Sequence, residues 1–256
     1  MDQRESFEAV ADLYAEVRRG YPAALFDDLE ALAGLGPACR VLEVGCGGGQ
    51  ATGDLAARAG RVLAIDPGAK LIDEARRRVS APNADFAVST FEAFEAAPGG
   101  FDLVASAQAW HWVDPEAGFP KAAAALADGG AMAVFGHVPV IPGEPFATPF
   151  KAIFDRYAPG AWGHPPPQAW YLPDGPVAGM FDASGLFGPV THRGYEWTWR
   201  LDAEGFGRYL RTDSGYHFLP EGPRFALFDE MCAAVAAEPT PFDTRWETHL
   251  YVARRA

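Results

Sequence analysis

The stretch Val41-Leu42-Glu43-Val44-Gly45-Cys46-Gly47-Gly48-Gly49 decides how this chain folds. Its aliphatic half is typical of a short buried strand, and its glycine half is typical of a tight turn that ends the strand. Residues 50–58 then have the pattern of a helix. Glycine permits positive φ angles and close approach of the backbone to a ligand, and a helix start presents unpaired N–H groups. We therefore predict a ligand-binding turn.

Strand and helix patterns alternate after this turn. Aliphatic runs predict strands at 40–45, 61–66, 85–88, 101–106, 131–136, 195–201 and 246–253. Amphipathic stretches predict helices at 50–59, 69–79, 115–127, 203–211 and 223–237. This order predicts an α/β fold with a doubly wound, Rossmann-like sheet of seven strands. The strands that alternate with helices should be parallel, and ligands should bind beyond the carboxyl ends of the strands.

Two further segments complete the predicted organisation. Apolar residues recur at helical spacing over 6–19 and 22–35, so two N-terminal helices should cover one edge of the sheet. In residues 138–189 prolines interrupt regular elements, while Phe, Trp and Tyr supply apolar area that a disordered segment lacks, which indicates an ordered aromatic, proline-rich cap. We predict one domain over 1–256, with a core at about 36–137, 190–201 and 244–256 and a cap at about 138–189 and 202–243.

Composition restricts the partners. The chain of 256 residues has 21 Lys and Arg against 34 Asp and Glu, a formal net charge of -13. This excess argues against nucleic acid or an anionic membrane as the main partner. No apolar run has the length of a membrane span and the N-terminus does not resemble a signal peptide, so we expect a cytoplasmic protein. Cys39, Cys46 and Cys232 are expected to be reduced thiols, and no metal site is expected.

Spacing excludes two phosphate-binding turns. A dinucleotide fingerprint needs glycine at its first, third and sixth positions, and the sixth residue counted from Gly45 or from Gly47 is not glycine. A Walker loop needs Gly-Lys-Ser/Thr, and no lysine precedes Lys70. The pattern that remains is Glu-x-Gly-x-Gly-x-Gly over 43–49, with the acidic Asp66 at the end of the second strand.

This pattern resembles motif I of the class I S-adenosylmethionine-dependent methyltransferases. A ligand without phosphate needs no lysine, yet close backbone approach to its amino-acid part still requires glycine. The resemblance implies S-adenosylmethionine as the cofactor, with both ribose hydroxyls held by Asp66 and the adenosine bordered by Pro67. It also implies that the cofactor site includes Glu43, as the partner that fixes the turn, and Gly45, Cys46, Gly47 and Gly49.

Residues 105–115, Ala-Ser-Ala-Gln-Ala-Trp-His-Trp-Val-Asp-Pro, resemble the aromatic-His-Trp signature of the branch called type 11, which includes trans-aconitate methyltransferase-like proteins. Residues 14–22 resemble that branch's Tyr-x-x-x-Arg-Pro-x-Tyr-Pro, so Tyr14 and Arg18 are candidates for the cofactor carboxylate, with packing and surface roles as the alternative. Thr90 stands where the family usually has an acidic residue at the adenine. The other implied cofactor contacts are Phe91, Ser106 and Gln108.

We expect methyl transfer to a small-molecule acceptor, by in-line displacement and at oxygen. N- or C-methylation is the alternative, and a cofactor-binding module without methyl transfer, or a cyclase, is the alternative of another class. His111 follows the fourth strand and is the candidate base or orienting group, although a packing role is the preferred interpretation. The candidate substrate-binding residues are Trp110, Trp112, His137, Tyr216 and His217. A monomer and a homodimer both remain open.

Overall fold

The computed structural model describes residue 13 and residues 17–163, 168–213, 216 and 219–256. Most of the first expected helix lies outside the described residues. The second is present as α3 (Ala23–Ala33), which follows Pro22 and ends at Gly34 with φ 76°. Glycine adopts this left-handed conformation without the steric cost that a Cβ atom brings, so the residue type explains where the helix stops.

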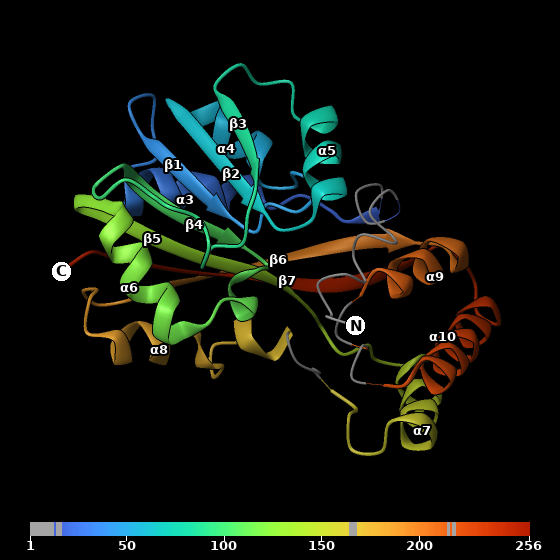
Figure 1. Ribbon diagram of the computed structural model, residues 1–256. Helices are drawn as coiled ribbons and strands as arrows, with labels where there is room; N and C mark the ends of the chain where they lie inside the picture. The colour runs from blue at the N-terminus through green and yellow to red at the C-terminus, as the bar shows by residue number, and fades with distance from the viewer. Residues whose placement is uncertain (1–12, 14–16, 164–167, 214–215, 217–218) are drawn as a thin grey trace.

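A seven-stranded sheet with the order β3-β2-β1-β4-β5-β7-β6 forms the centre of the molecule (Figure 1). Its strands are β1 (Arg40–Val44), β2 (Arg61–Asp66), β3 (Ala84–Val88), β4 (Phe101–Ala107), β5 (Leu126–Pro139), β6 (Thr191–Leu201) and β7 (Phe242–Arg254). The predicted α/β, doubly wound sheet is confirmed. The parallel order predicted from the alternating strands and helices is present in β1 to β5, whereas β7 runs antiparallel to both β5 and β6. Aliphatic patterning reports burial and carries no information on strand direction.

Helices cover both faces of the sheet (Figure 1). One face carries α3, α4 (Thr52–Arg58) and α5 (Ala69–Arg78), and the other carries α6 (Pro115–Ala125), α8 (Pro176–Ser184) and the short helices η1 (Trp110–Trp112) and η2 (Gln168–Tyr171). Each face of the sheet packs against its helices in an apolar cluster. Successive side chains of a strand point to opposite faces, so Leu103 and Ala105 belong to the cluster beside α3, α4 and α5, and Val104 belongs to the cluster on the other face. Burial on both faces explains the continuous aliphatic runs in the sequence.

A third apolar cluster lies beyond the sheet, where α7 (Ala147–Tyr157), α9 (Ala203–Arg211) and α10 (Glu221–Ala236) meet the ends of β6 and β7 (Figure 1). Phe150, Phe206 and Trp246 are among its buried members. Residues 138–189, which were predicted to form part of a cap, lie in two different places. They supply α7 to this third cluster, whereas Tyr171 and Phe181 are fully buried against the sheet. The division into core and cap stays a prediction.

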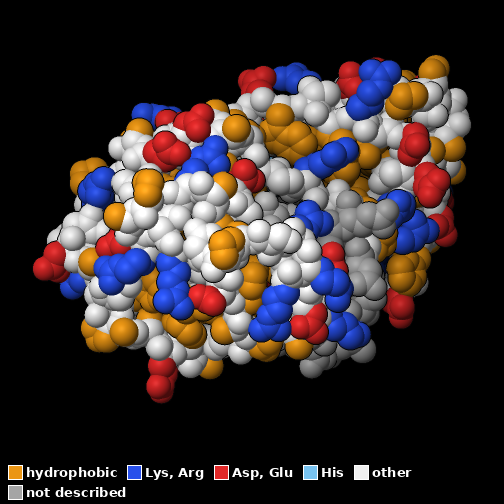
Figure 2. Space-filling view, turned by 90° about the horizontal axis from the view of Figure 1, so that it is seen from above, with side chains coloured by type: hydrophobic (Ala, Val, Ile, Leu, Met, Phe, Trp, Pro, Cys, Tyr) orange, Lys and Arg blue, Asp and Glu red, His pale blue; other side chains and the backbone are white. Residues whose placement is uncertain are grey.

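The surface carries mixed charges. Acidic and basic side chains are interspersed on the face shown in Figure 2, with hydrophobic side chains between them. Local charge on this face is therefore mixed, despite the net charge of -13. Within the described ranges, no helix combines the length and the apolar character needed to cross a membrane.

Candidate active site

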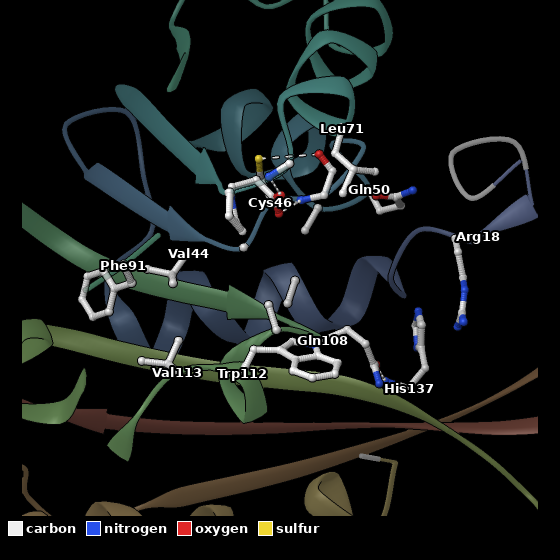
Figure 3. Close-up of a pocket in the computed structure, with 18 of the residues that line it drawn as sticks. Arg18, Val44, Cys46, Gln50, Leu71, Phe91, Gln108, Trp112, Val113 and His137 are labelled. Atoms are coloured by element: carbon white, nitrogen blue, oxygen red, sulfur yellow. Dashed lines mark hydrogen bonds between the residues drawn. The ribbon is translucent and has the colours of Figure 1, made fainter. Parts of the chain in front are cut away.

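A pocket opens at the carboxyl ends of β1, β2 and β4 (Figure 3). Its walls come from the turns after β1 and β2, from the loops after β3 and β4, and from His137 near the end of β5. Further lining residues come from segments that are distant in sequence, namely Arg18, Asp213 and Trp246. The pocket thus lies where the alternating strands and helices predicted a ligand.

The glycine turn after β1 forms one wall. Gly45, Gly47 and Gly49 have φ angles of 72°, 54° and 83°, a region that residues with a Cβ atom rarely adopt. A Cβ atom on Gly45 would lie 2.3 Å from the Cβ of Ala109, so this position also requires glycine for space. Gly45 and Cys46 donate backbone hydrogen bonds to the Ile65 carbonyl at 2.9 and 3.0 Å. Gly45, Cys46 and Gly47 line the pocket, whereas Gly49 packs behind it.

Asp66 joins this turn to the next strand. Its Oδ2 accepts a hydrogen bond from the Gly47 N–H at 2.9 Å, and its Oδ1 accepts one from the Gly68 N–H at 2.8 Å. The residue is 7% exposed and lines the pocket together with Pro67. The carboxylate at the strand end therefore shapes the turn as well as facing the cavity.

Glu43 lies beneath the turn and does not line the pocket. Its side chain is fully buried, and its Oε2 accepts a hydrogen bond from the Thr52 hydroxyl at 2.6 Å. Burial raises the pKa of Glu43 from 4.5 to about 8, because a carboxylate loses hydration inside the protein. Thr52 is near the start of α4, so Glu43 links β1 to the helix that follows the turn.

Arg18 and Asp213 meet at the polar end of the pocket. Arg18 donates to the Thr212 carbonyl at 2.7 Å, and its guanidinium lies 4.0 Å from the Asp213 carboxylate. Gln50 lines the same pocket, and its buried Nε2 has no hydrogen-bond partner among the described residues. A buried amide donor without a partner is costly, which indicates that a ligand acceptor satisfies it.

The opposite end of the pocket is more apolar, with Phe91 and Val113 well separated from Arg18 and His137 in Figure 3. Thr90 lines this end, and its hydroxyl accepts a hydrogen bond from the Ala93 N–H at 3.1 Å. Glu92 also lines the pocket, so an acidic group is present two residues after Thr90, the position at which this chain lacks the acidic residue of the family pattern. Glu92 could not be predicted as a site residue, because local sequence does not show that its side chain faces the pocket.

Gln108 and His137 form a bonded pair in the wall. Gln108 has φ 56°, an uncommon angle for a residue with a side chain, and its Oε1 accepts a hydrogen bond from the His137 N–H at 2.5 Å. The His137 ring stacks on Tyr21 with centroids 4.3 Å apart, and its Nδ1 is 2.8 Å from the Thr248 hydroxyl. Burial is the largest cause that lowers the pKa of His137 to about 3, so the ring is neutral near pH 7.

His111 is placed differently from His137. It does not line the pocket, and its Nδ1 lies 3.0 Å from the Tyr171 hydroxyl, among the rings of Trp112 and Trp170. Burial lowers the pKa of His111 to about 3. These contacts are those of a packing histidine, and a role as base or orienting group stays a prediction.

The other predicted residues lie in different parts of the protein. Trp112 lines the pocket. Trp110 is 1% exposed and belongs to the apolar cluster between the sheet and α6 and α8. The Ser106 hydroxyl donates a hydrogen bond to the Val44 carbonyl inside the sheet. Tyr216 lines a neighbouring pocket. Tyr14 and His217 lie outside the described residues.

Several lining residues were not predicted as site residues. Gln50 directly follows the glycine turn, so its position along the chain was an available signal. No local sequence signal pointed to Trp246, because this residue reaches the pocket only through the position of β7 in the sheet. The missed residues include Arg19, Tyr21, Gln50, Leu71, Glu92, Val113, Asp213 and Trp246.

Comparison with known proteins agrees with this geometry. Residues 41–130 match a family model described as a methyltransferase domain. The solved structure named as a type II methyltransferase from Anaeromyxobacter dehalogenans has a TM-score of 0.61 and 26% identity, over 93% of this chain and 97% of that one. Both similarities support a class I S-adenosylmethionine-dependent methyltransferase.

Curated relatives match a shorter part of this chain. An uncharacterised methyltransferase of Mycobacterium tuberculosis is 34% identical over 131 residues, 51% of each chain. The ubiquinone biosynthesis O-methyltransferase of Methylocella silvestris is 35% identical over 95 residues, 36% of this chain and 37% of its own. The chain thus spans about half the length of the first relatives. The family match includes the glycine turn, Asp66 and His111, whereas α7, α9 and α10 lie outside it.

Proposed function

We propose that this chain transfers a methyl group from S-adenosylmethionine to an oxygen atom of a small-molecule acceptor. The observation that carries the proposal is the glycine turn held by Asp66 at the floor of a pocket. No lysine occurs among the described residues that line this pocket, as expected for a cofactor without phosphate. The relative named as an O-methyltransferase supports oxygen as the methylated atom.

The residues of the pocket fit the cofactor. Gly45 lacks a Cβ atom, which would collide with Ala109 in the pocket wall, and the buried Nε2 of Gln50 needs an acceptor. In our proposal Gln50 and Arg18 hold the methionine carboxylate, Asp66 holds the ribose hydroxyls, and Phe91 lies against the adenine. Backbone groups at Gly45, Cys46 and Gly47 lie along the methionine part.

When bound, S-adenosylmethionine supplies a sulfonium methyl group, whose S–C bond breaks with its electron pair left on sulfur as the bond to the acceptor oxygen forms. The protein mainly has to align the acceptor and exclude water, and alignment can contribute roughly 7–11 kcal/mol. Trp112 and Trp246 supply apolar walls for this purpose, and Gln108 fixes the position of His137.

The histidines limit which oxygen acceptors fit. His111 and His137 both have a pKa of about 3, so neither is suited to remove a proton from an alcohol. An oxygen that ionises readily by itself, with its proton passing to water, needs no such base. We therefore expect a phenol or a carboxylic acid before an aliphatic alcohol.

Calorimetry with S-adenosylhomocysteine tests the first part of this proposal, and we expect saturable binding to one site. Acceptor panels followed by mass spectrometry test the second part, through a product heavier by one methyl group together with released S-adenosylhomocysteine. Absence of S-adenosylhomocysteine binding would refute the assignment. Methylated nitrogen or carbon would select the alternative acceptors, and turnover without added mass would favour the non-methylating class.

A further inference from the structure

A second pocket adjoins the proposed cofactor pocket on the side of α7, α9 and α10. Its cavity volume is about 420 Å³, which falls in the size range of small-molecule sites. Neither the family match nor the shared glycine turn includes these helices. Its lining is largely aromatic and includes Phe150, Phe206, Tyr209, Tyr216 and Trp246.

The two pockets have a common wall. Trp246 lines both of them, and Tyr209 of the second pocket donates a hydrogen bond to Asp213 of the first. Trp246 is 5% exposed, and its indole N–H donates to the Thr244 hydroxyl at 3.0 Å. A molecule that fills the second pocket and reaches past this wall would present one end to the cofactor pocket.

The second pocket favours an uncharged aromatic body. Phe150 and Phe206 stack with centroids 5.7 Å apart, which gives the cavity ring faces and edges of the kind that aromatic ligands contact. Among the residues that the structure describes, the charged ones that line this pocket are Glu144, Asp243 and Arg245, and all three are solvent-exposed. Two carboxylates against one guanidinium disfavour an anionic ligand in this pocket.

We infer that the second pocket binds the apolar, aromatic body of a phenolic methyl acceptor, whose hydroxyl group reaches past Trp246 into the cofactor pocket. This inference rests on the proposed function and adds the substrate class to it. A phenol meets both requirements, since its ring fits the aromatic walls and its hydroxyl, with an ordinary pKa of about 10, ionises more readily than that of an aliphatic alcohol. The phenolic proton passes to water as the O–CH3 bond forms.

Binding of three probes by the full chain tests the inference, with S-adenosylhomocysteine present and absent. The probes are 2-naphthol, its anionic analogue 2-naphthoate, and the aliphatic 1-decanol, each followed by calorimetry. We expect 2-naphthol to bind more tightly than the other two. Stronger binding of 2-naphthoate or of 1-decanol would overturn the inference, and so would absence of 2-naphthol binding to a protein that binds S-adenosylhomocysteine.

Variants locate the bound probe. Phe150→Leu and Phe206→Leu each remove one ring from the second pocket and should raise the Kd for 2-naphthol about 3- to 10-fold, the range for one aromatic contact. The Kd for S-adenosylhomocysteine should not change. Phe181→Leu is the matched control, because this buried ring packs against the sheet and lines neither pocket. Thermal unfolding verifies that each variant folds, and an unchanged Kd for 2-naphthol in both folded variants would overturn the assignment.

The inference and the proposed function fail in different ways. A protein that does not bind S-adenosylhomocysteine contradicts the proposed function. A protein that binds it, yet binds 2-naphthol no more weakly after Phe150→Leu and Phe206→Leu, contradicts only the second-pocket assignment.

Discussion

One carboxylate oxygen of Asp66 accepts a hydrogen bond from the Gly47 N–H at 2.9 Å, and this bond ties the end of β2 to the turn after β1. The other oxygen accepts from the Gly68 N–H at 2.8 Å. A single side chain thus holds two turns in place at the mouth of two neighbouring strands. Because both turns line the pocket, the shape of the proposed cofactor site depends on this carboxylate.

Asp66→Ala should weaken S-adenosylhomocysteine binding by about 10- to 100-fold, the effect of losing a charged hydrogen-bond acceptor. Two backbone N–H groups also lose their partner, so the turns should loosen. Calorimetry measures the Kd. Asp85→Ala is the control, because Asp85 is exposed on β3 and bonds Arg61 outside the pocket. Equal affinity of the Asp66 variant and the wild type would refute the role given to Asp66.

Gly45→Ala should reduce both stability and cofactor binding. The residue has φ 72°, and its new Cβ would lie 2.3 Å from the Cβ of Ala109. Backbone strain and steric collision would therefore both lower the stability of the variant. Gly34→Ala is a matched control, since Gly34 has φ 76° and a Cβ there would meet nothing within 4 Å. The control should cost about 1 kcal/mol for the left-handed backbone alone. Urea unfolding should show a larger loss for Gly45→Ala, and equal losses would contradict the collision.

Glu43→Gln should change how stability depends on pH. The pKa of Glu43 is about 8 in the folded protein against an ordinary value of 4.5, so the folded state binds the proton more tightly. Stability from this group is present below pH 4.5 and is lost as pH rises toward 8, by roughly 4–5 kcal/mol in total.

Urea unfolding at about pH 5 and about pH 9 measures this difference. Relative to the wild type, Glu43→Gln should gain stability at the higher pH, because a neutral amide pays no such penalty. The control is Glu196→Gln, on a side chain that is 76% exposed. A wild type and a Glu43→Gln variant with the same pH dependence would show that the carboxyl group is ionised when folded.

His111 and His137 should remain neutral across the physiological range. Their folded pKa values of about 3 lie below the ordinary 6.5, so their contribution to stability is present above pH 6.5 and is lost as pH falls toward 3. NMR of the ring protons from about pH 8 to about pH 5 should show no titration of either residue. A midpoint close to 6.5 for His137 would contradict its burial and make it a candidate base.

Much of the fold was predictable from local pattern. The strands around the glycine turn, the helices after them and the position of Asp66 at a strand end all follow from short-range signals. The length of β5 was underestimated, because Leu126 already pairs with Phe101 directly after α6 ends. Pairing with a neighbouring strand extends a strand beyond its aliphatic centre, and the partner is not visible in the local sequence.

The sequence by itself determined the sheet, the turn and the absence of a phosphate-binding pattern in that turn, because periodicity and glycine spacing act over a few residues. Only the tertiary structure decided which side chains meet around the pocket. Arg18 reaches Asp213 across almost the whole chain, Trp246 arrives because β7 inserts between β5 and β6, and His137 rather than His111 faces the cavity. Such contacts depend on the packing of distant elements, which no local pattern encodes.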